Sequence, residues 1–280
     1  MNNYIDVKLF KFEKVIIINF ISYQIIMRNV PDLHDMESER NIPEITISYD
    51  LEKDVQNRRA AKNKFSNFKT YEDMEPHEQE ILNSVIWLSF NEAREILLPY
   101  LSARYERQKK RIDEKVKNMK IVLDKQKEII FENMEKLTKR PIYLNKFTIR
   151  GTTCIRWPYN PETWEIWKYI FIKPEWMERN CAHAFAHELL HMQTHKYYPH
   201  IPPMNQLNHQ QFNLIKESLT FLLNHEFPWV NMAADRWYPD HQEFRKILED
   251  YRLSCWDKKD FEDLIKFGCD YILKNGLLTK

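Results

Sequence analysis

Residues 183–195 read HAFAHELLHMQTH, and this stretch decides how the rest of the chain is interpreted. Residues 187–191 within it form an H-E-x-x-H pattern in a segment that is expected to be helical. Side chains four positions apart project from the same face of a helix, so His187 and His191 can converge on one metal ion while Glu188 lies beside them. The pattern therefore predicts two metal ligands and an acid on one short piece of helix.

The histidines of this helix form a longer stripe, because His183, His187, His191 and His195 follow one another at intervals of four. One metal ion can take two adjacent members, so spacing alone also permits His191 with His195. Only the pair at 187 and 191 flanks an acid that is placed to act as a base. We therefore expect His183 and His195 to lie beside the site or to face solvent.

A third protein ligand is needed, since a catalytic zinc ion usually has three of them and a water molecule. The pattern that takes a third histidine from six residues further on is excluded, because Thr194 and Tyr197 replace its glycine and histidine. Glu217 on the following helix is the best remaining residue, because a carboxylate on an apolar face requires a partner. The alternatives that remain open are Glu226, His225 and His209.

Before the motif the sequence predicts strands and long helices. Residues 44–49 alternate like a strand, and helices are expected near 76–98 and, beyond a kink at Pro99, to about residue 139. The second of these is amphipathic, with Ile112, Val116, Met119, Leu123, Ile130, Met134 and Leu137 on one face. It is expected to back a sheet; a coiled-coil dimer is the alternative, although Gln126 interrupts the seam.

The remaining elements surround the motif. Residues 142–157 are expected to form a hairpin that turns near Arg150 and Gly151, and residues 164–173 a further strand. Pro174 begins the motif helix, which ends before Pro199. The next helix opens with the capping pair Asn208 and Gln211 and closes at Pro228, and two short helices follow at 242–251 and 259–274.

These elements predict an α+β fold that is mostly helical, with a small sheet of three strands, or four as the alternative. The sheet should be accompanied by a long backing helix, the motif helix and the glutamate helix. The expected domains are an N-terminal arm, a helical connector, a core and a C-terminal helical extension, at residues 1–75, 76–103, 104–227 and 228–280.

Composition excludes several classes of protein. The chain has 280 residues and a formal net charge of +1, which gives no basic surface for nucleic acid or acidic membranes. Its three glycines form no phosphate-binding loop. Its four cysteines form no C-x-x-C pair, which suits free thiols in a reducing compartment.

The N-terminal apolar run at residues 15–27 is too short to span a membrane and lacks a small-residue cleavage site. A cytoplasmic protein is therefore expected, with a secretory or anchor segment as the alternative. Met27 is an alternative start, which would leave residues 1–26 outside the native protein.

With H-E-L-L-H at 187–191 and a glutamate helix around Glu217, the chain resembles the gluzincin zinc metallopeptidases. The order of its elements over residues 104–227 is most similar to the small members called minigluzincins. One departure is Lys216, which stands where many gluzincins have asparagine. The resemblance implies a zincin-like catalytic core in which His187, His191 and Glu217 hold Zn²⁺.

The resemblance also implies the chemistry. Glu188 would be the general base in the hydrolysis of protein or peptide substrates. The strand before the motif helix would form the substrate rim, at Trp164, Ile166, Lys168 and Ile170. A donor for the oxyanion would come from Tyr197, Tyr198, His225, Arg236, Tyr238 or His241. Some relatives are held latent by a segment outside the core, which makes self-inhibition by the N-terminal arm a hypothesis.

The sequence is also compatible with two other functions. The chain could be a metal-binding regulatory or toxin-linked protein with little general proteolytic activity. It could also be a helical interaction module in which the H-E-x-x-H pattern is accidental; the long helix before residue 139 supports that reading.

Overall fold

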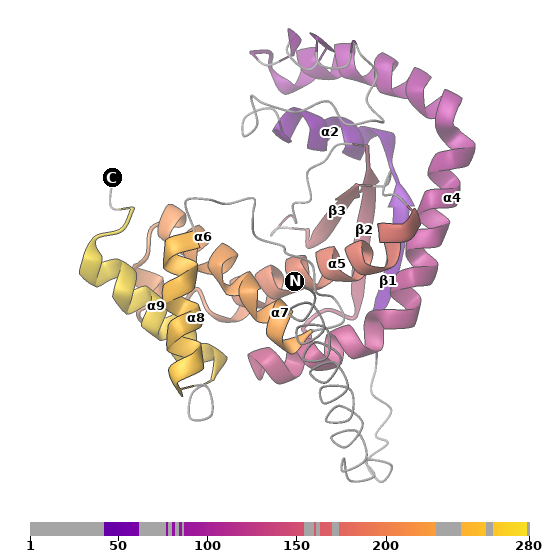
Figure 1. Cartoon of the computed structure of the whole chain (residues 1–280). Coiled ribbons are helices and arrows are strands. Elements are labelled where there is room, and N and C mark those ends of the chain that lie inside the picture. The colour runs from indigo at the N-terminus through magenta and orange to yellow at the C-terminus, as the bar shows by residue number, and fades with distance from the viewer. Residues whose placement is uncertain are drawn as a thin grey trace, which may run out of the picture. The chain divides into compact units, whose positions relative to one another are not determined.

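The computed structural model describes residues 42–61, 77, 80–81, 84–85, 87–153, 160, 163–169, 174–227, 242–255 and 260–278. Within these, the chain forms a small sheet and a larger set of helices, coloured along the sequence in Figure 1. The strands are β1 (Glu44–Tyr49), β2 (Lys146–Thr152) and β3 (Glu165–Tyr169). The helices are α2 (Leu51–Ala61), α4 (Phe90–Thr138), α5 (Pro174–Tyr197), α6 (His209–Ser218), α7 (Leu222–Glu226), α8 (Gln242–Cys255) and α9 (Phe261–Asn275), with 3₁₀ turns η2 (Met204–Gln206) and η3 (Leu219–Phe221). The predicted α+β fold, mostly helical with a three-stranded sheet, is confirmed.

The sheet has the order β1-β2-β3, and both pairings are parallel. The expected hairpin at Arg150 and Gly151 is therefore wrong. Gly151 lies inside β2, with Tyr49 as its partner on one side and Lys168 on the other. Arg150 fixes this arrangement, since its guanidinium donates to Ser48 of β1 and to Glu165 of β3 at 2.9 Å each. Parallel neighbours need a long crossover, which α2 and α4 provide between β1 and β2.

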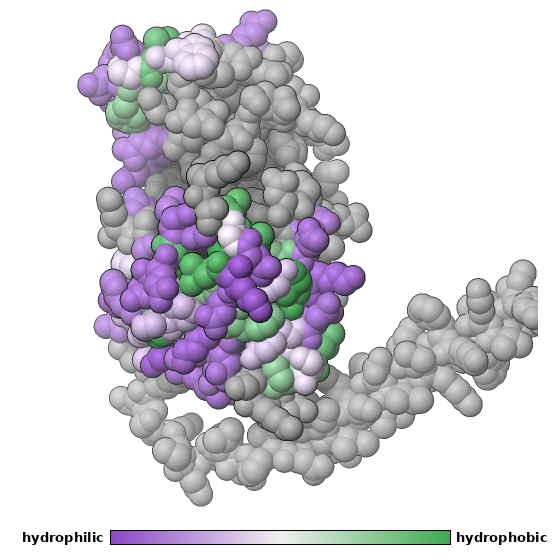
Figure 2. Space-filling view, turned by 90° about the vertical axis from the view of Figure 1, so that its left-hand side faces the viewer, coloured by the Kyte–Doolittle hydropathy of each residue, from purple (hydrophilic) through white to green (hydrophobic). Residues whose placement is uncertain are grey.

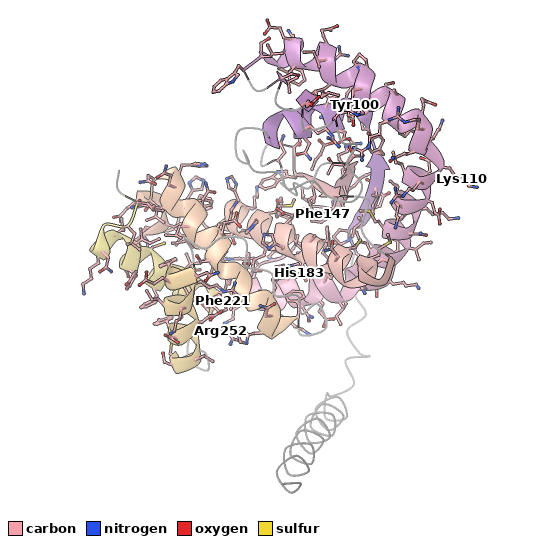
Figure 3. All side chains as sticks on the ribbon, turned by 45° about the horizontal axis from the view of Figure 1, so that its top comes forward. Tyr100, Lys110, Phe147, His183, Phe221 and Arg252 are labelled. Atoms are coloured by element: carbon pink, nitrogen blue, oxygen red, sulfur yellow. The ribbon has the colours of Figure 1, made fainter. Side chains whose placement is uncertain are left out.

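One face of the sheet packs against α4 and α5. Phe147 of β2 is fully buried between Phe131 of α4 and Phe185 of α5, with ring centroids 5.4 and 5.6 Å away. Figure 3 shows Phe147 beside α5, which carries His183, whereas Lys110 points outward from α4. This contact holds the motif helix against the sheet.

Helix α4 runs without interruption from residue 90 to residue 138, with Pro99 inside it. The expectation of two helices divided at Pro99 is thus wrong. The helix begins at a capping box, in which Ser89 and Glu92 bond each other's backbone N–H groups. Its first turns pack on α2 in a small separate core made of Val55, Val85, Ala93, Leu97 and Leu101. This one continuous helix therefore spans the boundary between the predicted connector, residues 76–103, and the predicted core, residues 104–227.

Residues 44–61, which the sequence assigns to the N-terminal arm, form β1 and α2. Ile45 is 1% exposed and belongs to the main core. Residues 42–280 make up one compact unit, and residues 1–41 lie outside the described part of the chain. The alternative start at Met27 also falls outside it.

The helices after the motif match the expected positions with one refinement. The helix expected from Asn208 to Phe227 is divided into α6, η3 and α7. The Thr220 hydroxyl donates to the carbonyl of Glu217 at 2.8 Å, which accompanies the tighter turn at this point. Beyond it, α8 and α9 pack against α6, and Figure 1 shows these three helices together on the left.

The surface on the side of these helices is mixed, with hydrophobic patches among mainly hydrophilic residues (Figure 2). No helix among the described residues has the length and apolar character needed to cross a bilayer. Cys181, Cys255 and Cys269 form no disulfide in the described part of the chain, and Cys154 lies outside it.

Candidate metal centre

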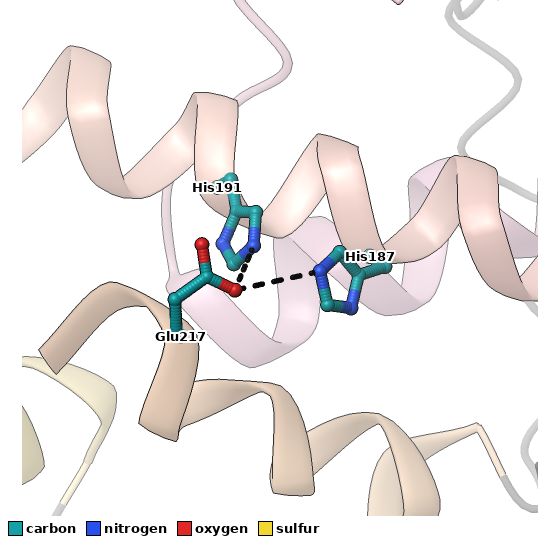
Figure 4. A group of neighbouring side chains, drawn as sticks. All are labelled: His187, His191 and Glu217. Carbon is teal, nitrogen blue, oxygen red and sulfur yellow. Dashed lines mark hydrogen bonds and ion pairs between the residues drawn. The ribbon is translucent and has the colours of Figure 1, made fainter. Parts of the chain in front are cut away.

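The two motif histidines and Glu217 meet between α5 and α6 (Figure 4). Glu217 Oε2 lies 3.1 Å from His191 Nε2 and 3.8 Å from His187 Nε2. The three potential ligand atoms all lie within 4.8 Å of one another, and no other such group occurs in the described ranges. Ligands of a tetrahedral zinc ion are about 3.4 Å apart. The group is therefore spaced to hold a metal ion.

Local structure explains how two helices supply these side chains. On α5 the four-residue interval places the rings of His187 and His191 4.3 Å apart, between centroids, on one face. The polypeptide then reverses through residues 198–208, and Asn208 caps α6 by accepting from the backbone N–H of Gln211. This cap fixes the start of α6, so that Glu217 comes opposite the motif two turns later.

Burial leaves the imidazoles neutral. Loss of hydration is the main cause that lowers the pKa of His187 well below its ordinary value, and the nearby His191 adds to it. The pKa of His191 is lowered chiefly by burial too, although Glu217 opposes this shift. His191 is 2% exposed and His187 18%. At neutral pH each ring therefore offers a nitrogen lone pair, which is the form that binds metal ions.

Glu217 carries the negative charge of the group. Burial by itself raises the pKa of this carboxyl, but His191, Lys216 and His187 overcome that effect and hold the pKa well below its ordinary value. Lys216 contributes directly, with its Nζ 3.3 Å from Glu217 Oε1. One carboxylate and two neutral imidazoles match the donors that zinc and other divalent transition metals accept.

The other stripe histidines are outside this group. The ring of His183 is 6.1 Å from that of His187, between centroids, and is 5% exposed. His195 packs edge-on against Trp164 and Phe212, at 5.9 and 5.5 Å between centroids. The candidate ligands therefore include His187 with His191, and the alternative pair of His191 with His195 is not among them.

The alternative third ligands also lie elsewhere. His209 is exposed at the start of α6 and shares a hydrogen bond of 2.9 Å with Asn213. His225 is exposed on α7, beside Phe221. The side chain of Glu226 is outside the described residues. Neither His209 nor His225 belongs to the group of His187, His191 and Glu217.

Glu188, the predicted base, follows His187 on α5 and is 5% exposed. The tyrosines proposed as oxyanion donors are directed to other partners: Tyr197 and Tyr198 donate to the carbonyls of Pro141 and Thr138, both at 2.9 Å. They lie at the end of α5, which continues well past His191. The other predicted donors, Arg236, Tyr238 and His241, lie outside the described residues.

The residues predicted for the substrate rim lie in or next to β3, which is an outer strand of the sheet among the described residues. Ile166 is 2% exposed, so its side chain belongs to the core, and Trp164 is half-buried. Lys168 is in β3, but its side chain, like the whole of Ile170, is outside what the structure describes. Of the four residues predicted for the rim, the structure therefore describes the side chains of Trp164 and Ile166 alone.

Two features escaped the sequence reasoning. The contact of Lys216 with Glu217 has no local signal, since adjacent helical residues normally diverge. The second feature is a buried hydrogen-bond network that joins α2 to the end of β2. Its only signal in the sequence is weak: Asp54 and Arg58 are four residues apart. Asp54 accepts from the hydroxyls of Thr152 and Thr153, and Arg58 donates to Thr153.

Comparison with known proteins gives no match to any family model, curated protein or solved structure.

Proposed function

We propose that this protein is a zinc metallopeptidase of the gluzincin type, with a zincin-like core, in which His187, His191 and Glu217 are the ligands and Glu188 is the general base. The observation that carries the proposal is the convergence of Glu217 Oε2 on both motif imidazoles, at 3.1 and 3.8 Å. Two histidines and a glutamate are among the ligand sets of catalytic zinc. Helix geometry fixes the histidine pair, whereas only the fold brings in the carboxylate.

The proposed chemistry assigns a separate task to Glu188. Bound zinc would supply the Lewis acidity that polarises a peptide carbonyl and acidifies water. Glu188 would take the proton from the attacking water and deliver it to the amine that leaves. Its position next to His187, with 5% of the residue exposed, supports a base that is largely withdrawn from bulk solvent.

The substrate would be an extended segment of protein. Strand β3 lies at an edge of the sheet within the described part of the chain, is the last described element before the motif helix and contacts it. Such an edge can accept another strand through backbone hydrogen bonds. Because the Ile166 side chain faces the core, recognition at this position would involve the backbone of β3.

Metal content and the Glu188→Gln variant together test the proposal. Purified wild type should hold about one zinc per chain, and His187→Ala should lose it. Glu188→Gln should keep the zinc yet cleave unstructured protein substrates at least about 100-fold more slowly. Glu132→Gln on α4 is a matched control, since Glu132 is an exposed partner of Lys136 and should retain both properties.

The rival functions give other results. Zinc-loaded wild type that cleaves nothing across broad peptide libraries would favour a regulatory or toxin-linked protein. Absence of bound metal would favour the helical interaction module. Iron in place of zinc would also oppose the proposal, because two histidines and a carboxylate equally suit non-haem iron(II).

A further inference from the structure

The two oxygens of Glu217 have different partners. Oε2 faces the histidines, 3.1 Å from His191 Nε2, whereas Oε1 lies 3.3 Å from Lys216 Nζ. Only one oxygen is therefore directed to the position that a metal ion would take. The other forms an ion pair with a residue of the protein itself.

Lys216 is an unusual place for an ammonium group, because its side chain is only 10% exposed. Lysines are seldom this buried unless they are paired with an anion. Adjacent residues of a helix lie about 100° apart, so the ammonium reaches Glu217 through its long flexible stem. The fold thus withdraws a cation from solvent and places it against the metal group.

This cation has opposite effects on the two states of the site. Without metal, Lys216 balances the charge of the Glu217 carboxylate, which would otherwise be buried beside two neutral imidazoles. With metal, the ammonium is a positive charge close to a divalent cation, and the two repel each other. Both effects favour the metal-free state.

We propose that Lys216 is a resident counter-cation of Glu217, which stabilises the metal-free protein and weakens zinc binding. This inference rests on the proposed zinc site. It concerns a positioning residue that acts through a ligand, and it predicts a reversible centre from which zinc can be removed without unfolding the protein.

Zinc affinity of the full-length chain, measured by competition with a chromogenic chelator, tests the inference. Lys216→Met should bind zinc about tenfold more tightly than wild type, which corresponds to about 1.4 kcal/mol. In the presence of EDTA, the same variant should melt about 2–4 °C lower than wild type. Lys216→Arg keeps the charge and should restore wild-type affinity. Lys216→Gln should behave as Lys216→Met does, and it replaces that variant if methionine prevents folding.

Two further variants serve as controls for the zinc-affinity measurement. Lys136→Met removes an exposed lysine that pairs with Glu132 on α4 and should leave zinc affinity unchanged. Glu217→Gln should bind zinc much more weakly. If Glu217→Gln loses zinc but Lys216→Met binds it no more tightly than wild type, the counter-cation role is overturned while the zinc site stands. If wild type itself binds no zinc, both proposals fail.

Discussion

At the scale of single residues, the candidate site combines two neutral rings with one charged carboxylate. Burial lowers the pKa of His187 and His191, whereas Lys216 and the histidines lower that of Glu217 in spite of burial. All three groups are thereby deprotonated at neutral pH, as a metal ligand must be, although the charge of Lys216 itself opposes a bound cation. The folded protein therefore keeps the three groups at neutral pH in the protonation state that a metal ion would require.

The lowered histidine pKa values predict that the metal-free protein loses stability in mild acid. In the unfolded chain both rings titrate at about pH 6.5. Because the pKa of both rings is lower in the folded protein, the unfolded chain binds more protons than the folded protein once the pH falls below about 6.5. The contribution of the two neutral histidines to the free energy of unfolding is therefore complete above this pH and is lost as the pH falls further. Each histidine can add a slope of up to about 1.4 kcal/mol per pH unit.

Urea unfolding in EDTA between pH 7 and pH 5 measures this slope. His187→Gln should make the fall in unfolding free energy shallower, while His209→Gln, at an exposed position on α6, should not. Glu217 affects a different window, because its contribution is lost only below its ordinary pKa of about 4.3. A wild-type unfolding free energy that stays constant from pH 7 to pH 5 would contradict the burial argument.

At the scale of elements, several helices start at side-chain caps that can be identified in the sequence. Asn208 and Gln211 form the predicted capping box of α6, and Ser89 and Glu92 form that of α4. The second box is an S-x-x-E signature that marks the start of α4 in the sequence. The caps determine where each helix begins, and through α6 they set the position of Glu217.

The cap of α9 gives a prediction at this scale. Asp260 accepts from the backbone N–H groups of Glu262 and Asp263 and pairs with Lys139 at 3.2 Å. Asp260→Ala should lower the free energy of unfolding by about 1 kcal/mol, because those donors lose their acceptor. Asp260→Asn keeps the acceptor and loses the charge, so chemical denaturation of both variants separates the two effects. Equal losses in both would show that the ion pair with Lys139 matters more than the cap.

At the scale of the whole molecule, the N-terminal elements belong to the same unit as the candidate site. Strand β1 is an outer strand of the sheet among the described residues, and α2 is fixed to the end of β2 by the buried Asp54 and Arg58. The side chains of both are 0% exposed. Removing one member of such a pair leaves an uncompensated buried charge, which costs about 3–5 kcal/mol.

Truncations test this organisation. The chain 42–280 contains the whole compact unit and should unfold cooperatively and bind zinc as the full chain does. The chain 76–280 lacks β1 and α2, which leaves Thr152 and Thr153 without the Asp54 network, and it should melt far lower or aggregate. Circular-dichroism melting compares the two chains. Equal melting temperatures would contradict the inclusion of β1 and α2 in the same folding unit as the candidate site.

The same truncation bears on self-inhibition. Residues 1–41 can be removed without touching β1, so cleavage by the chain 42–280 tests the inhibitory arm without damage to the sheet. Higher activity than the full chain would support inhibition by these residues, and equal activity would oppose it.

Features that depend on short spacing could be predicted from the amino-acid sequence. An interval of four places His187 and His191 on one helix face, and the Asn208 cap and Pro174 mark helix starts, because helix geometry is local. These features were enough to predict the histidine pair and two helix starts, and the periodicity of apolar residues predicted the fold class. Glu217 was the best of several acids and histidines, but spacing could not select it.

Which distant residues meet depends on packing, which the sequence pattern does not reveal. The parallel direction of β2, the place of β1 and α2 in the sheet, and the contact between Lys216 and Glu217 depend on packing across long sequence separations. A strand has nearly the same local pattern whether its neighbour runs parallel or antiparallel, and a flexible lysine can reach several partners. The packing of α5 on the sheet and the reversal into α6 select one arrangement, and that arrangement brings a carboxylate to the two imidazoles.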